Sequence, residues 1–144
     1  MKKPLIIKVS LINSAEDIHA SRQIREEVFV VEQRVPPEIE YDEYEESATH
    51  IIAKIDGKPV GTARWRVTDS GQKLERFAVL KSARRMGVGA ALVNFVLDQI
   101  GETETAYLNS QISAMDFYSS LGFEATGPVF YEADIPHRKM IRKL

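Results

Sequence analysis

Two arginines and two glycines near the middle of the chain have the types and spacing of an anion-binding loop. They follow a strand-like run that ends at Leu80, and they stand where a helix is predicted to begin. Glycines leave the backbone N–H groups of a helix start approachable, with the positive end of the helix dipole behind them. The predicted loop consists of Arg84, Arg85, Met86, Gly87, Val88, Gly89 and Ala90. We expect it to bind a group as highly charged as a pyrophosphate.

Two common phosphate-binding loops do not match these residues. A P-loop requires Lys and then Ser or Thr after its last glycine, whereas Ala90 and Ala91 follow Gly89. A dinucleotide-binding fold requires a third glycine where Leu92 stands, with an acidic residue about 20 positions later. The loop therefore belongs to another class of anion site, or its glycines only permit close packing of a strand against a helix.

A second group of residues with useful chemistry follows about 30 positions later. The spacing of Ala114, Phe117, Tyr118 and Leu121 predicts one face of a helix, and Gly122 is expected to end it. A phenol has a pKa of about 10 and is protonated at neutral pH, which makes Tyr118 a candidate proton donor. The alternative is that Tyr118 is a half-buried aromatic side chain that only packs.

The acidic residues are unevenly distributed along the chain. Six of them fall within nine positions: Glu38, Glu40, Asp42, Glu43, Glu45 and Glu46. A charge run of this kind is usually a solvated loop. The alternative is that its field draws a cationic substrate toward a site.

Composition restricts the class of protein. The 144 residues, 44% hydrophobic and 28% charged, predict one globular domain over positions 1–144. A net charge of −2 does not suggest a nucleic-acid binder, and no apolar run is long enough for a membrane span or signal peptide, so we expect a cytoplasmic protein. The lack of cysteine excludes disulfides, thiolate metal sites and a cysteine nucleophile, and no metal is expected. The oligomeric state is left open, a homodimer included.

The elements that must position these residues alternate between strands and helices. Strands are predicted at 5–11, 48–55, 58–67, 74–80, 105–108, 123–130 and 135–141, with a hairpin turn at Asp56-Gly57. Helices are predicted from Ser14 to the prolines at 36–37, from Gly87 onward, and over 111–121. The order β-α-β-β-β-α-β-α-β-β indicates an α/β (α+β) fold with a mixed, mainly antiparallel sheet.

Several of these motifs resemble one family. Arg84-x-x-Gly87-x-Gly89 behind a strand resembles the pyrophosphate loop of the GNAT N-acetyltransferase superfamily. The segment Ala114-x-x-Phe117-Tyr118-x-x-Leu121-Gly122-Phe123 resembles the part of that superfamily that contacts the thioester end of coenzyme A. Nearly the whole chain is similar to the ElaA-like branch, through Ile24-Arg25, Val28-Phe29-Val30, Glu32-Gln33, Val35-Pro36, Glu40, Asp42, His50, Ile135-Pro136-His137 and Met140.

The resemblance implies transfer of an acetyl group from acetyl-CoA to a primary amine. Tyr118 would be the general acid toward sulfur, and Glu32, Glu75, His50, His137 or a water would be the base. The cofactor would contact the loop of residues 84–90, the backbone of Phe77, Ala78 and Val79, and the side chains of Gln111 (where the family often has Asn), Ala114, Phe117 and Tyr118. Acceptor contacts would come from Glu32, Glu40, Asp42 and His50.

The resemblance does not identify the acceptor, because fold and cofactor do not specify it. A peptide amine, a lysine side chain, a polyamine and an aminoglycoside are equally admissible, and the acidic run favours a cationic one. Neither nucleic acid nor membrane is expected as a partner. Two alternatives to catalysis remain: a sensor that binds acyl-CoA or a nucleotide, and an interaction protein that uses residues 36–46 as its contact loop.

Overall fold

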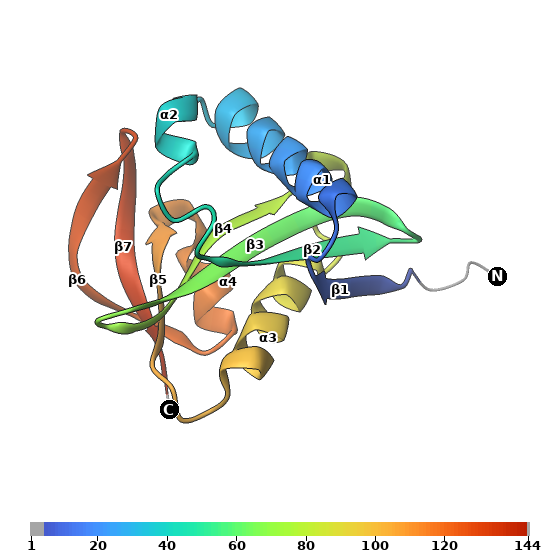
Figure 1. Ribbon diagram of the computed structural model, residues 1–144. Coiled ribbons are helices and arrows are strands. Elements are labelled where there is room, and N and C mark those ends of the chain that lie inside the picture. Colours follow the sequence, from blue (N-terminus) through green and yellow to red (C-terminus); the bar gives the residue numbers. More distant parts are fainter. Residues whose placement is uncertain (1–4, 144) are drawn as a thin grey trace.

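Seven strands form one mixed sheet in the order β1-β2-β3-β4-β5-β7-β6 in the computed structural model, which describes residues 5–143 (Figure 1). The bounds are β1 (Ile7–Leu11), β2 (Thr49–Ile55), β3 (Lys58–Thr68), β4 (Gly71–Val79), β5 (Ala106–Gln111), β6 (Phe123–Glu132) and β7 (Ile135–Arg142). The β4–β5 pair is parallel, and the other pairs are antiparallel. The predicted fold class and order of strands are confirmed.

The helices cover both faces of this sheet. Helix α1 (Ala15–Arg25), which continues into the π-helical segment η1 (Glu26–Glu32), and the short α2 (Pro37–Glu40) lie on one face. Helices α3 (Val88–Ile100) and α4 (Met115–Ser120) lie on the other (Figure 1). Single 3-10 turns, η2 (Lys81–Ala83) and η3 (Ile112–Ala114), precede α3 and α4. Within residues 5–143, no helix is both long enough and apolar enough to cross a bilayer.

Local sequence signals explain most helix boundaries. The Ser14 hydroxyl accepts a hydrogen bond from the Asp17 N–H at 3.1 Å, which is the capping interaction expected from the sequence. Helix α2 was not predicted, although Pro37 occupies its first turn, a position that proline tolerates well. The helix predicted over 111–121 is wrong at its start, because Gln111 ends β5 and residues 112–114 form the 3-10 turn.

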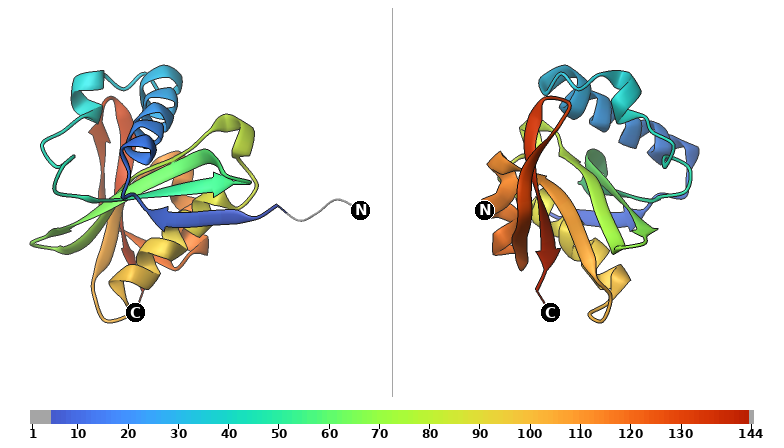
Figure 2. Two further views of the ribbon diagram at one scale, coloured as in Figure 1. Left: turned by 45° about the vertical axis from the view of Figure 1, so that its right-hand side comes forward. Right: turned by 90° about the vertical axis from the view of Figure 1, so that its left-hand side faces the viewer.

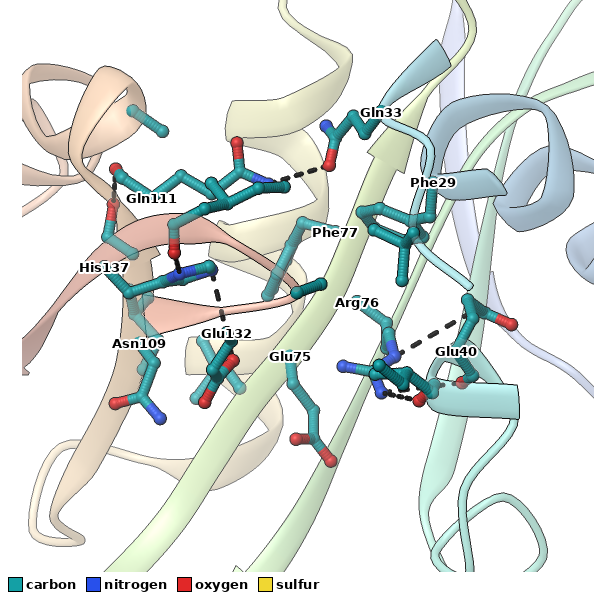
Figure 3. A pocket seen from close by; sticks show the side chains of 18 of the residues that line it. Phe29, Gln33, Glu40, Glu75, Arg76, Phe77, Asn109, Gln111, Glu132 and His137 are labelled. Carbon is teal, nitrogen blue, oxygen red and sulfur yellow. Dashed lines mark hydrogen bonds and ion pairs between the residues drawn. The ribbon is translucent and has the colours of Figure 1, made fainter. Parts of the chain in front are cut away.

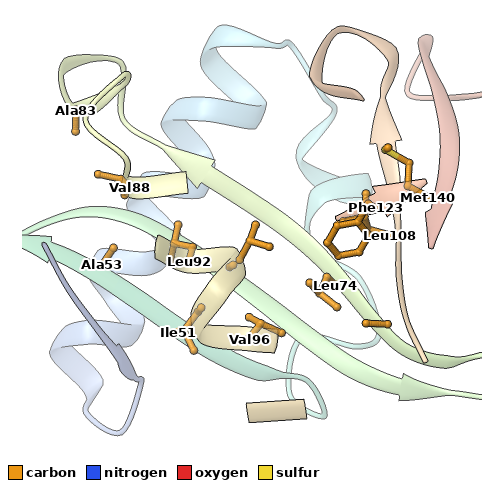
Figure 4. Close-up of a cluster of buried hydrophobic side chains, with 13 residues drawn as sticks. Ile51, Ala53, Leu74, Ala83, Val88, Leu92, Val96, Leu108, Phe123 and Met140 are labelled. Carbon is orange, nitrogen blue, oxygen red and sulfur yellow. The ribbon is translucent and has the colours of Figure 1, made fainter. Parts of the chain in front are cut away.

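The core lies between α3 and the sheet. Val88, Leu92 and Val96 are at most 1% exposed and form an apolar stripe along α3 (Figure 4). They belong to one cluster with buried side chains from the sheet, including Ile51, Leu74, Leu108, Phe123 and Met140. This packing fixes the start of α3 against β4, so the glycine loop has a defined position relative to the sheet.

Strands β4 and β5 pair at one end and diverge toward the other. They pair only at Gln72–Ala106, Lys73–Tyr107 and Leu74–Leu108. Beyond this point a bulge interrupts the β3–β4 pairing, and Arg76 has a positive φ of 61°. A bulge bends its strand away from its neighbour. The far half of β4, including Phe77, Ala78 and Val79, is therefore left without a strand partner on the β5 side.

Candidate functional site

A cleft of about 250 Å³ opens where β4 and β5 diverge (Figure 3). Its lining comes from η1 and α2 on one side and from β5, η3, α4 and the β6–β7 hairpin on the other. The tip of that hairpin rises beside α2 in each view (Figures 1 and 2). The lining residues are Phe29, Gln33, Val35, Ile39, Glu40, Lys73, Leu74, Glu75, Arg76, Phe77, Leu108, Asn109, Ser110, Gln111, Ala114, Tyr118, Glu132, Ala133, Ile135 and His137.

The glycine loop lies at the start of α3. Gly87 is the N-cap, with a φ of 87° that side chains rarely adopt, and a Cβ there would have only the tip of Ile7 within 4.0 Å. A Cβ on Gly89 would come within 3.1 Å of the Phe117 ring. The Phe117 ring lies 5.0 Å from the ring of Tyr118, which lines the cleft. The loop is thus connected to the cleft through this aromatic pair.

The exposed backbone of the loop fits a pyrophosphate. The N–H groups at the start of α3 have no side-chain cap, and a glycine with open space around it lets an anion approach the backbone closely. Arg84 is 40% exposed, and its guanidinium donates to the carbonyl oxygen of Val79 and to Glu32. Arg85 and Met86 are also exposed on the same loop.

Tyr118 sits in an aromatic cluster at one end of the cleft. Its ring meets those of Phe77, Phe117 and Phe123 edge-on, with centroids 6.3, 5.0 and 6.1 Å away. Burial raises the pKa of the phenol above its usual value, so the hydroxyl stays protonated at neutral pH. A protonated hydroxyl at a cleft wall can donate a proton to a group bound there.

His137 has a defined tautomer. Its Nδ1 lies 2.7 Å from the carbonyl oxygen of Ile135, and a carbonyl can only accept, so Nδ1 carries the proton. The Nε2 atom of the neutral ring is then a free acceptor, 4.0 Å from the Glu132 carboxylate (Figure 3). The ring also stacks on Phe130, with centroids 5.8 Å apart, which fixes its plane.

Glu75 is held by three cations. Its carboxylate lies 3.0 Å from Arg64, 2.8 Å from Arg66 and 3.5 Å from Lys73. Burial acts to raise the pKa of Glu75, but these positive charges outweigh it and lower the pKa. A carboxylate that is stabilised in this way is a weaker proton acceptor than a free one.

The acidic run does not present six free negative charges to the site. Three of its carboxylates are tied to buried or partly buried arginines: Glu40 and Glu45 to Arg25 at 2.5 Å each, and Asp42 to Arg64 at 2.6 Å. Glu40 lines the cleft, whereas the exposed acids Glu38, Glu43 and Glu46 do not. The expectation of a six-charge field at the site is therefore corrected, because ion pairs cancel half of the run.

The structure brings together some predicted site residues and separates others. Glu75, Phe77, Gln111, Ala114, Tyr118, His137 and Glu40 line the cleft, and Ala78 and Val79 follow Phe77 along the diverging half of β4. Three predicted acceptor contacts do not line it. Glu32 pairs with Arg84, Asp42 belongs to the arginine network, and His50 donates to the carbonyl oxygen of Glu45 around a different hollow.

Sequence reasoning missed most of the other lining residues, and four of them bring aromatic or polar groups to the cleft. Arg76 and Asn109 reach the cleft because β4 bulges and β5 extends further than predicted. Phe29 reaches it from η1, and Glu132 from the end of β6. Glu132 had one available signal, since it and Ile135 flank a two-residue turn that brings Glu132 toward His137.

Comparison with known proteins identifies the family. Residues 14–144 match the acetyltransferase (GNAT) domain model. The chain is 38% identical over 139 residues to YjcF, an uncharacterised N-acetyltransferase of Bacillus subtilis, covering 94% of this chain and 99% of that one. It is 30% identical over 138 residues to the ElaA protein of Escherichia coli, covering 91% and 90%.

Two crystal structures are also similar. Escherichia coli ElaA superposes with a TM-score of 0.83 at 27% identity, covering 96% of this chain and 99% of that one. An acyl-CoA N-acyltransferase from Pseudomonas aeruginosa superposes with a TM-score of 0.82 at 28% identity, with the same coverage. The chain belongs to the GNAT family of acyl-CoA-dependent N-acetyltransferases.

Proposed function

We propose that this protein transfers an acetyl group from acetyl-CoA to a primary amine by direct attack within the cleft. The observation that carries the proposal is the divergence of β4 and β5, which opens a cleft flanked by a candidate proton donor, Tyr118, and a candidate proton acceptor, His137. A cleft of this kind gives the two reactants a common place to meet. The chain has no cysteine to form an acetyl-enzyme, which favours direct attack.

The residues at the α3 end of the cleft would hold the cofactor. The loop of residues 84–90 offers backbone N–H groups and two arginines to the pyrophosphate. The backbone of residues 77–79 has no strand partner on the β5 side, and groups exposed on that side would hydrogen-bond the pantetheine amides and stabilise negative charge on the thioester oxygen. The lining residues Gln111 and Ala114, together with Phe117, would contact the arm near its reactive end.

His137 is the base that the geometry supports best. Its Nε2 lone pair is free, whereas the carboxylate of Glu75 is shared among three cations. The ammonium form of the acceptor first loses one proton to solvent. The neutral amine nitrogen then forms a bond to the acetyl carbon and gives a second proton to Nε2. The carbon–sulfur bond breaks, and the Tyr118 hydroxyl gives its proton to the departing sulfur.

The thiol released from acetyl-CoA tests this function. The purified protein would be incubated with acetyl-CoA and a panel of amines, namely hexylamine, a peptide, spermidine and an aminoglycoside. We expect amine-dependent thiol release in at least one case. Tight binding of acetyl-CoA without thiol release in any case would instead favour the non-catalytic sensor.

A further inference from the structure

We infer that the acceptor is an amine with a single positive charge and an apolar body, seated between α2 and the β6–β7 hairpin. This inference rests on the proposed function and specifies its substrate class. It follows from which charges in the cleft are already neutralised and from where the apolar lining lies.

The Glu40 carboxylate is not free to bind a cationic acceptor. Its side chain is 1% exposed, and one carboxylate oxygen lies 2.5 Å from the Arg25 guanidinium and 3.8 Å from Arg76 Nε. Its other oxygen has no hydrogen-bond partner but is buried, as is Arg76 Nε, so neither atom meets the open cleft. The two arginines already balance this carboxylate.

Glu75 is also occupied, and its neighbours repel a second cation. Arg64, Arg66 and Lys73 share its carboxylate. The ion-pair network around Glu40 and Glu75 holds five bases against four acids, an excess of one positive charge, and Lys73 and Arg76 of this network line the cleft. An acceptor carrying several ammonium groups would therefore place one of them beside fixed positive charge.

Three acids line the cleft among the residues that the structure describes, and Glu132 is the one whose carboxylate is not paired with an arginine or lysine. Its side chain is 51% exposed, and its ion-pair partner within 4.0 Å is His137, through Nε2. Figure 3 shows the two side chains facing each other within the cleft. An amine held by Glu132 would thus sit next to Nε2, the atom proposed to accept a proton from it during the attack.

Apolar side chains form part of the lining on this side of the cleft. Phe29 comes from η1, Val35 from the connection between η1 and α2, Ile39 from α2, and Ile135 from β7. Ile39 is 48% exposed, an apolar side chain presented at the rim of the cleft. An aliphatic or aromatic body attached to the amine would cover these side chains, whereas a polyamine or an aminoglycoside would leave them in contact with polar groups.

A matched pair of amines tests the inference. Hexylamine and 1,6-diaminohexane have the same chain length and differ in the second ammonium group. We expect kcat/KM from thiol release to favour hexylamine by roughly tenfold, the effect of one charge placed without a partner near fixed cations. Equal or higher kcat/KM for the diamine would overturn the inference and leave the proposed function intact.

Three variants separate recognition of the amine from general damage to the protein. Glu132→Gln should raise KM for hexylamine several-fold, whereas Glu43→Gln, an exposed acid outside the cleft, should not change it. Ile39→Asp supplies the missing second carboxylate, so it should shift the preference toward the diamine. If the Glu132 and Glu43 variants have the same KM, or if Ile39→Asp leaves the preference unchanged, the assignment is wrong.

A binding measurement keeps the test independent of turnover. Calorimetry with each amine, in the presence of coenzyme A, should show binding of hexylamine and much weaker binding of 1,6-diaminohexane. That result without any thiol release would contradict the proposed function but support the acceptor class. No binding of either amine, or tighter binding of the diamine, would overturn the inference.

Discussion

Tyr118 and His137 show how far individual residues can be read from the sequence. Tyr118 was singled out because the segment around it resembles the GNAT segment that contacts the thioester end of coenzyme A, and the structure places it on the cleft wall. His137 was one of four candidate side chains for the base. Its advantage depends on the contact of Nδ1 with the Ile135 carbonyl oxygen, a detail of turn geometry that no residue pattern encodes.

Removing the Tyr118 hydroxyl should slow the reaction without weakening cofactor binding to the same extent. Tyr118→Phe keeps the three edge-on aromatic contacts and removes only the proton donor. General acid catalysis typically contributes about 10²–10⁴-fold, and we expect a fall in kcat near the lower end. A kcat within about threefold of wild type would show that Tyr118 only packs.

Replacing His137 should affect the chemical step as well. His137→Gln removes the Nε2 acceptor, and we expect kcat to fall by about 10²-fold or more. Glu75→Gln should cost less kcat, because its carboxylate is paired with cations. Steady-state kinetics with saturating acetyl-CoA would check both. If the Glu75 variant loses more activity than the His137 variant, the two roles are exchanged.

At the scale of elements, the order of strands was predictable because each strand has its own apolar pattern and turn. The split of the 111–121 segment was not, since the stripe from Ala114 to Leu121 is compatible with one continuous helix. The bulge at Arg76 could not be predicted from the sequence either, because it arises from a shift in the pairing register between β4 and β3. That shift opens the cleft, so the most useful feature of the site comes from strand pairing rather than from composition.

The glycine at the start of α3 should matter for the cofactor beyond its backbone strain. Gly87→Val forces a side chain into a φ of 87° and places bulk where an anion would approach the backbone. Gly101→Val is a control for strain, with a φ of 85° and open space at the other end of the same helix. Its ψ of 173° lies outside the left-handed helical region of Gly87, so Gly101→Val should lose at least as much stability as Gly87→Val, about 1–3 kcal/mol.

Acetyl-CoA affinity should separate these two variants. We expect a sharp loss of affinity in Gly87→Val and little change in Gly101→Val, measured by calorimetry after circular dichroism has confirmed folding. Equal affinities in the two variants would mean that the loop does not contact the cofactor.

The whole molecule is held together at the acceptor side by a network of ion pairs. Arg25, Arg64 and Arg76 connect α1 and the sheet to the acids of residues 40–45. The sequence showed only an acidic run and scattered arginines, and their pairing needs the tertiary fold. For this reason the acidic run was interpreted as a solvated loop, or as a source of attraction for a cationic substrate, rather than as a set of ion pairs that stabilises the fold.

Arg64 should be essential to stability, because its side chain is fully buried between Asp42 and Glu75. Arg64→Met removes one cation from each carboxylate, while Arg76 still faces Asp42 and Arg66 and Lys73 still face Glu75. It should therefore cost about 3 kcal/mol at pH 7, the lower end of the range for breaking a buried pair. Urea unfolding followed by the fluorescence of Trp65, the single tryptophan, measures this. Lys54→Gln, which removes a partly exposed pair with Asp17, should cost less than about 1 kcal/mol.

The loss of unfolding free energy caused by Arg64→Met should become smaller at acidic pH. Burial acts to raise the pKa values of Asp42 and Glu75, but Arg64 outweighs it and lowers them. Groups with a lowered folded-state pKa stabilise the protein above their unfolded pKa of about 4, and that stabilisation is lost as the pH falls through the folded value. The gap between wild type and variant should therefore narrow below about pH 4. A gap that is constant with pH would show that Arg64 stabilises by packing alone.

The fate of the acetyl group tests the central claim most directly. Protein would be mixed with isotopically labelled acetyl-CoA and a reactive amine, then quenched within one turnover and measured by mass spectrometry. Direct transfer predicts labelled N-acetyl amine and free coenzyme A in a one-to-one ratio, with the mass of the protein unchanged. Coenzyme A without acetylated amine, or label on the protein before it reaches the amine, would contradict direct transfer.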